Sequence, residues 1–270
     1  MFNVPSFFGF RSGGESFDPD ALAFFARVDT ATGVSDYLTS TEKNAVNNLV
    51  VQMKADLIWT SMKAIYPMVG GGTGTLAQRQ AACEQNLKSS SFTGTFTSGW
   101  TFASTGVNGN GTSAYFDTNC IITSDLPSTN YGVGFYKRST NATNAADIGR
   151  NTANLNIYSK YVPDGLTYHR GIGATPDNYA QIPNNGFYHQ YGKTANSTAF
   201  YNGTKKLTGT AGNTTNSGLS LCLAGLIFPP TGFNSSQYTF LFTSESLSDD
   251  EAGYLYNAVQ AFQTTLSRQV

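Results

Sequence analysis

The chain has little charge and no long apolar run. Of its 270 residues only 12% are charged, about half the usual share in globular proteins, and the net charge is -1. Because no basic run is present, we expect no nucleic-acid partner. No apolar stretch approaches the roughly 18 residues that a transmembrane helix needs, so we expect no membrane insertion.

Cysteine and histidine are scarce. The three cysteines, Cys83, Cys120 and Cys222, are far apart, odd in number and in no CxxC spacing. This pattern indicates reduced thiols in a protein assembled in a reducing cytoplasm. A zinc site needs four nitrogen or sulfur ligands, and only His169 and His189 could join the cysteines, without ligand spacing. We therefore expect no metal site of this kind.

No glutamate occurs between Glu84 and Glu245. A retaining glycosidase needs two carboxylates about 5–5.5 Å apart, usually at alternate positions of one strand. No GxSxG turn and no phosphate-binding loop is present either. The aspartates in this stretch are scattered: Asp117, Asp125, Asp147, Asp164 and Asp177. We expect no enzyme.

Calcium is the one cofactor that the residue pattern does not exclude. Asp164 beside Gly165, or Asp177 with Asn178, could supply oxygen ligands. Each pair is equally typical of a turn. No other cofactor is expected.

Aromatic residues and glycine are abundant, at 13% and 28 residues. From about Phe92 to Phe242, short aromatic and β-branched runs are divided by Gly, Asn, Pro and Asp, which predicts an antiparallel sandwich. The most apolar run, "LSLCLAGLIFPP", predicts a strand buried on both faces. Asn202-Gly203 predicts a tight hairpin turn, followed by Lys205 and Lys206 as edge charges that discourage aggregation.

Three helices are predicted by an N-cap followed by proline or by a capping box. The first is short and extends to about Val28, and the second is expected to continue to Pro67. Their start signals, and that of a C-terminal helix, are Asp18 with Pro19, Thr39 with Glu42, and Ser248 with Glu251.

Residues 1–16 have the composition of an arm. The phenylalanines of this arm would be a liability if exposed, so they either pack back on the same chain or dock on a neighbouring subunit or assembly. The segment lacks the features of a signal peptide, so an extracellular role would be reached by another route than ordinary secretion. The residues concerned are Phe2, Phe7, Phe8 and Phe10.

A segment rich in tyrosine resembles a binding surface. Sugars present hydroxyls to polar side chains and a C–H face to aromatic rings, and tyrosine-rich loops are typical of binding sites. The alternative is that these tyrosines pack on the sandwich, as tyrosine often does in strands. The candidate ligand-binding residues are Tyr161, Tyr168, His169, Tyr179, Tyr188, His189 and Tyr191.

Several segments together carry a resemblance to a known family. They are "FDPDALAFF", "VNNLVVQMKADLIWTSMKAIYPMVGG", "GWTFASTGVNGNGTSAYFDT", "FYNGTKK" and "LSDDEAGYLYNAVQAFQTTLSRQV". With them the chain resembles the concanavalin A-like, or laminin G-like, jelly-roll virion proteins of tailed bacteriophages, which are frequent among crAss-like phages. The resemblance covers Phe17 to Val270, although residues 130–195 match poorly.

The resemblance implies a mainly β fold: a two-sheet antiparallel concanavalin A-like jelly-roll sandwich with an N-terminal helical hairpin and a C-terminal helix. Its divisions would be the arm at 1–16, a helical region at 17–72 and the sandwich with its helix at 73–270. It also implies a virion location after assembly in the bacterial host cytoplasm, with release by lysis. It carries over no catalytic residue.

The sequence therefore predicts a head or tail fibre or decoration subunit with a lectin-like outward domain that binds host surface glycans. By analogy with phage fibres we expect a homotrimer in contact with other virion proteins. Three alternatives remain: a purely structural decoration protein without glycan binding, a glycan depolymerase, and a cellular carbohydrate-binding module.

Overall fold

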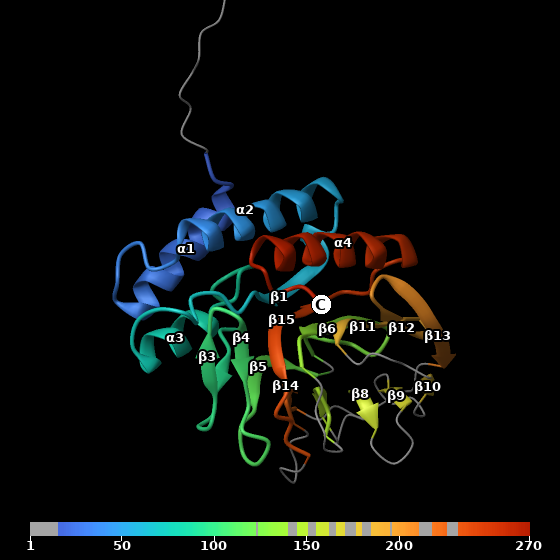
Figure 1. Ribbon diagram of the computed structural model, residues 1–270. Coiled ribbons are helices and arrows are strands. Elements are labelled where there is room, and N and C mark those ends of the chain that lie inside the picture. The colour runs from blue at the N-terminus through green and yellow to red at the C-terminus, as the bar shows by residue number, and fades with distance from the viewer. Residues whose placement is uncertain are drawn as a thin grey trace, which may run out of the picture.

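The computed structural model describes residues 16–122, 124–139, 145–150, 155–161, 166–170, 177–179, 185–194, 196–210, 218–225 and 232–270. For residues 160, 161, 170, 177–179 and 210 it describes the backbone alone. Two antiparallel sheets pack face to face, with helices over one of them (Figure 1). The mainly β, two-sheet sandwich with helices near both ends of the chain is confirmed.

Sheet A has eight strands in the order β13-β12-β11-β6-β15-β4-β3, with β1 paired to β15 beside this path. Strand β6 lies between β11 and β15, so the middle of the sheet depends on pairings between distant parts of the chain. The strands are β1 Met62–Tyr66, β3 Thr101–Ala103, β4 Gly106–Asn108, β6 Asn130–Lys137, β11 Gly186–Lys193, β12 Asn196–Tyr201, β13 Thr204–Thr210 and β15 Gln237–Ser244.

Sheet B has seven strands in the order β10-β9-β8-β7-β14-β5-β2. They are β2 Thr95–Phe96, β5 Phe116–Ile121, β7 Ile148–Arg150, β8 Leu155–Tyr161, β9 Leu166–Arg170, β10 Asp177–Tyr179 and β14 Ser220–Leu223. All four residues of β14 are buried, as the apolar run predicted. Residues 226–230 of that run lie outside the described residues.

Two apolar layers hold the fold together, and β6 contributes to both. Val133 and Phe135 point between the two sheets, into a core that also contains Leu221 and Leu223 of β14. Tyr136 points the other way, towards the helices. This alternation follows from the two-residue period of a strand, and it shows that sheet A is buried on both faces.

Four α-helices and one 3₁₀ helix are described: α1 Pro19–Thr32, α2 Ser40–Ala55, η1 Trp59–Ser61, α3 Leu76–Cys83 and α4 Asp249–Thr265. The Asp18 N-cap and the capping boxes at the starts of α2 and α4 are present as predicted. Helices α2 and α4 pack side by side over sheet A, and α1 packs against α2 and α3 (Figure 1). Among the described residues, no helix is long and apolar enough to cross a bilayer.

The prediction that the second helix continues to Pro67 is wrong. Helix α2 ends at Ala55, and the chain turns at Leu57, which adopts a left-handed φ of 60°. Residues 62–66 then form β1, where Ile65 lies opposite Phe242 of β15. A pairing with a strand almost 180 residues away has replaced the helix that the local spacing favoured, because a strand's partner is not encoded nearby.

The Asn202-Gly203 hairpin is confirmed. Both residues have positive φ, 47° and 73°, and they join β12 to β13 at the edge of sheet A. This pair of positive φ values matches the twist of the flanking strands. Lys205 lies on the edge strand as expected, and its Nζ is 2.9 Å from Asp249 Oδ2 at the start of α4.

Candidate functional site

The outer face of sheet B is the sheet face over which no helix lies in the described part of the chain (Figure 1). On this face Tyr158 of β8 lies directly opposite Tyr168 of β9, and both side chains are half-buried. Their neighbours Ile157 and His169 are also opposite each other, but they are buried in the molecule. Because successive side chains alternate, Tyr158 and Tyr168 form a pair on the outer face.

A second row of polar positions crosses the same face beside the tyrosine pair. Asn156, two residues before Tyr158, lies opposite Gly149 of β7. That row continues through Cys222 of β14 to Asp117 of β5. Asn156 and Cys222 are buried, whereas the Asp117 side chain is half-buried. Aromatic rings with a neighbouring carboxylate can contact both the C–H face and the hydroxyls of a sugar.

The structure places four of the predicted binding residues in the interior. His169 and Tyr188 lie between the sheets with stacked rings, 6.3 Å between centroids. His189 and Tyr191 point to the opposite side of β11, below α4, where the Tyr191 hydroxyl donates to Asp249. The expectation that these four side chains lie on exposed loops is wrong. They pack on the sandwich, which is the alternative that the sequence left open.

The structure describes the side chain of only one of the three remaining predicted ligand-binding residues. Tyr168 lies on the outer face, whereas Tyr161 and Tyr179 end β8 and β10 with only their backbone described. Tyr158 was not predicted, although the alternation in "LNIYSKY" could have identified it as facing the same side as Asn156. The arm phenylalanines lie outside the described residues, and their docking role stays a prediction: Phe2, Phe7, Phe8 and Phe10.

The buried histidines are uncharged and the buried thiols stay protonated near neutral pH. Burial lowers the pKa of His169 and of His189 to about 3, so both are neutral near pH 7. All three cysteines are free and buried; burial raises the pKa of Cys120 to about 11 and also raises those of Cys83 and Cys222. A thiol held protonated in this way is a poor nucleophile and a poor metal ligand.

Metal-binding groups do not gather in the part of the chain that the structure describes. Within it, no three His, Cys, Asp or Glu side chains lie close enough to hold an ion. Of the two turn positions considered for calcium, Asp164 lies outside the described residues and Asp177 is described by its backbone alone. The calcium hypothesis therefore stays a prediction.

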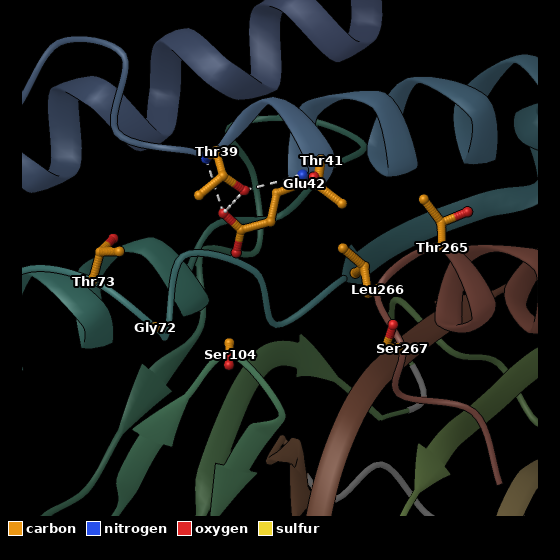
Figure 2. Close-up of a pocket in the computed structure, with 9 residues that line it drawn as sticks. All are labelled: Thr39, Thr41, Glu42, Gly72, Thr73, Ser104, Thr265, Leu266 and Ser267. Atoms are coloured by element: carbon orange, nitrogen blue, oxygen red, sulfur yellow. Dashed lines mark hydrogen bonds between the residues drawn. The ribbon is translucent and has the colours of Figure 1, made fainter.

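A hollow of about 260 Å³ lies between the start of α2, the loop before α3, the β3–β4 turn and the end of α4 (Figure 2). Its one carboxylate, Glu42, is already engaged: Oε1 accepts from the Gly70 N–H at 2.7 Å and Oε2 from the Thr39 N–H at 3.0 Å. The rest of the lining is mainly hydroxyl groups and includes no aromatic ring: Thr39, Thr41, Thr73, Ser104, Thr265 and Ser267, with Gly72 and Leu266. Without a ring to stack on a sugar, this hollow is a weaker candidate than the outer face of sheet B.

Two of the described aspartates of the sandwich have a local structural role. Asp117 accepts from the Asn119 N–H at 2.8 Å, and Asp125 accepts from the Ile121 N–H at 2.7 Å. Asp147, in contrast, is buried between the sheets.

Comparisons with known proteins show the fold. No protein-family model matches the chain, and no curated protein matches its sequence. Domain 4 of AbnA, a GH43 extracellular arabinanase from Geobacillus stearothermophilus in complex with arabinotriose, is 14% identical, with a TM-score of 0.51 over 72% of this chain and 98% of that domain. A Trypanosoma rangeli sialidase mutant with trans-sialidase activity is 10% identical, with a TM-score of 0.52 over 80% of this chain but only 39% of the sialidase. At these identities the similarity establishes a shared β-sandwich and nothing about ligands.

Proposed function

We propose that this protein is a carbohydrate-binding β-sandwich whose binding face is the outer face of sheet B. One observation carries the proposal: Tyr158 and Tyr168 lie side by side on the sheet face that the described helices leave uncovered. Two neighbouring rings offer an apolar platform, and the half-buried Asp117 in the next row adds a hydrogen-bonding carboxylate.

The physical argument favours weak, multivalent recognition. A ring stacked on another apolar face adds about 1 kcal/mol beyond area burial, so a two-ring platform binds a short glycan weakly. Several copies on one particle would convert weak contacts into strong attachment. A fold shared with a domain crystallised with arabinotriose is compatible with this role.

We further propose that the protein is a virion subunit of a tailed bacteriophage, a fibre or decoration protein that is non-enzymatic and homotrimeric. The support is the resemblance in sequence over Phe17 to Val270 and the arrangement of the layers. The helices and the outer face of sheet B lie on opposite sides of the molecule (Figure 1), so anchoring through the helical side leaves the glycan face outward. Apolar side chains are exposed on that helical side: Val51 at 48%, Leu57 at 79% and Tyr254 at 46%.

Glycan binding is tested with the purified protein on a glycan array and then by titration calorimetry with a bound oligosaccharide. Tyr158→Ala and Tyr168→Ala should each weaken binding about fivefold or more, the equivalent of about 1 kcal/mol. Tyr254→Ala is the matched control, because this tyrosine is exposed on α4 and should leave affinity unchanged. Binding to no glycan would favour the purely structural role, and release of reducing sugar would establish a depolymerase.

The virion role is tested separately by mass spectrometry of purified phage particles. Deleting residues 1–16 should leave the melting temperature unchanged and reduce incorporation into particles. Normal incorporation would defeat the anchoring role of Phe2, Phe7, Phe8 and Phe10. Failure of this experiment would not bear on glycan binding, because the substitutions of Tyr158 and Tyr168 test the outer face of sheet B independently.

A further inference from the structure

A lysine, an aspartate and an asparagine meet in the interior of the sandwich. Lys137 ends β6, Asp147 precedes β7, and Asn234 lies just before β15. The exposed fraction of each of the three residues is 0%. The three come from both sheets, and in the sequence Asp147 is only one of several scattered aspartates.

One oxygen of Asp147 contacts both nitrogen atoms of its neighbours. Oδ1 lies 2.9 Å from Lys137 Nζ and accepts from Asn234 Nδ2 at 3.0 Å. The Tyr238 hydroxyl also donates to this oxygen, at 2.8 Å. The other oxygen, Oδ2, accepts from the Ser159 N–H at 2.7 Å, which holds the carboxylate in place.

The orientation of the Asn234 amide is set by the backbone. Its Oδ1 accepts from the Ser236 N–H at 2.8 Å. A backbone N–H can only donate, so the amide oxygen faces Ser236 and the amide nitrogen faces Asp147. A fixed donor on this oxygen polarises the amide carbonyl and would stabilise negative charge that develops there.

This arrangement contains every group that an amide exchange requires: an amine nucleophile, a polarised amide, a carboxylate in contact with the attacking and leaving nitrogens, and a donor on the oxygen. We propose that Lys137 and Asn234 form an intramolecular isopeptide bond, with Asp147 as the catalytic residue.

The reaction balances without a cofactor. Asp147 takes a proton from the Lys137 ammonium, and the neutral Nζ attacks Cγ of Asn234, whose oxygen becomes negative against the Ser236 N–H. Asp147 passes this proton to Nδ2, the Cγ–O double bond re-forms as the Cγ–Nδ2 bond breaks, and ammonia leaves. Asp147 then takes the second proton from Nζ and passes it to the ammonia. The products are one Nζ–Cγ amide and one ammonium ion, and Asp147 returns to its carboxylate form.

Burial favours this chemistry because Lys137, Asp147 and Asn234 are shielded from bulk water. Exclusion of water protects the amide from hydrolysis. In an exposed cluster, water would compete with Nζ for the amide carbon.

The bond would cross-link the sandwich at its centre. Lys137 lies opposite Tyr238 in the β6–β15 pairing, only four residues beyond Asn234. A covalent link here would connect the end of β6 to the start of β15 and close a long loop that includes β7 to β14. The unfolded chain would lose entropy, so the folded sandwich would resist heat, protease and pulling force.

The intact mass of the purified full-length protein tests the proposal directly. We expect the mass to be lower than that of the sequence by one ammonia, and a protease digest to contain a branched peptide joining Lys137 to Asn234. Lys137→Arg and Asp147→Asn should each restore the full mass. Lys205→Arg, a change at an exposed lysine, should keep the deficit.

Wild-type protein at full sequence mass, unchanged after prolonged incubation, would overturn the proposal without any variant having to fold. A deficit that persists in Lys137→Arg would overturn it too, because the ammonia would then come from cyclisation elsewhere. A deficit with no branched peptide at these positions would have the same meaning.

Discussion

The Tyr256 ring of α4 lies against the backbone of Gly203, so that a Cβ atom at position 203 would come within 2.5 Å of Tyr256 Cδ1. The hairpin between β12 and β13 is thereby locked to the C-terminal helix. The turn needs glycine for two reasons, its φ of 73° and the missing side chain.

Gly203→Val should therefore destabilise the protein by about 2 kcal/mol or more, from the left-handed φ together with the clash. The measurement is urea unfolding followed by circular dichroism. Gly33→Val is the matched control: Gly33 has a φ of 68°, but nothing lies within 4 Å of a Cβ there. Equal losses from both substitutions would show that the Tyr256 contact contributes nothing.

We expect the free energy of unfolding to decrease at acidic pH because His189 is buried in its neutral form. Its ring lies among aromatic rings, with 5.1 Å to Phe242 between centroids, and neither of its nitrogen atoms has a hydrogen-bond partner among the described residues. Its folded pKa of about 3 lies below the value of about 6.5 expected when unfolded. The unfolded state therefore binds the proton first, so the stability is fully present above about pH 6.5 and is lost as pH falls towards 3.

The expected loss is about 1.4 kcal/mol per pH unit within that window for each histidine so buried. Urea unfolding at several pH values between about 7 and 4 measures it. His189→Phe should flatten the profile relative to the wild type, since phenylalanine suits the aromatic surroundings and does not titrate. Parallel profiles for the two proteins would contradict the burial of this side chain.

Arg268 should contribute more to the stability of the fold than its position near the C-terminus suggests. Its guanidinium is buried and donates to the carbonyl oxygens of Met68 and Pro67 at 2.9 and 3.1 Å. Arg268→Ala leaves both oxygens buried without this donor and should cost about 3 kcal/mol. Arg79→Ala is the control, since Arg79 donates to two carbonyls at the surface, and it should cost less than about 1 kcal/mol. Thermal unfolding compares the two variants, and a similar cost for both would rule out the buried role.

The two capping-box glutamates, Glu42 and Glu251, should differ in how much they stabilise the protein. Glu42 caps α2 and also accepts from the Gly70 N–H, which ties the loop before α3 to the helix, whereas Glu251 only caps α4. Loss of a cap costs about 1 kcal/mol. Glu42→Ala should cost about 1 kcal/mol more than Glu251→Ala, measured by urea unfolding. A difference near zero would mean that the Gly70 contact is energetically neutral.

Local signals in the sequence were reliable where the chain interacts with its neighbours along the sequence. The capping boxes at Thr39 and Ser248 and the Asn202-Gly203 turn depend on residues at most three positions apart, and all three are present. The buried strand around Leu221 and the antiparallel sandwich followed from composition and spacing. Helix α3 was missed, although its capping box at Thr75 and Gln78 was available as a signal.

The candidate site was predicted only in part. Tyr168 was chosen for its residue type and lies on the outer face, but Tyr188 and His189, chosen for the same reason, are buried. Composition cannot distinguish a ring that faces solvent, such as Tyr168, from one that faces the other sheet, such as Tyr188, because the residue type is the same. The pairing of Tyr158 with Tyr168 depends on strand register, which the sequence alone does not reveal.

By itself the sequence determined where α1, α2 and α4 begin and where the Asn202-Gly203 turn lies, because those preferences depend on backbone sterics and on side chains a few residues apart. Tertiary structure alone decided that residues 62–66 join β15, that the described helices lie over sheet A rather than over the outer face of sheet B, and that Lys137, Asp147 and Asn234 meet. The reason is that strand partners and buried contacts are selected by the burial of apolar surface across the whole chain, over separations at which local pattern carries no information.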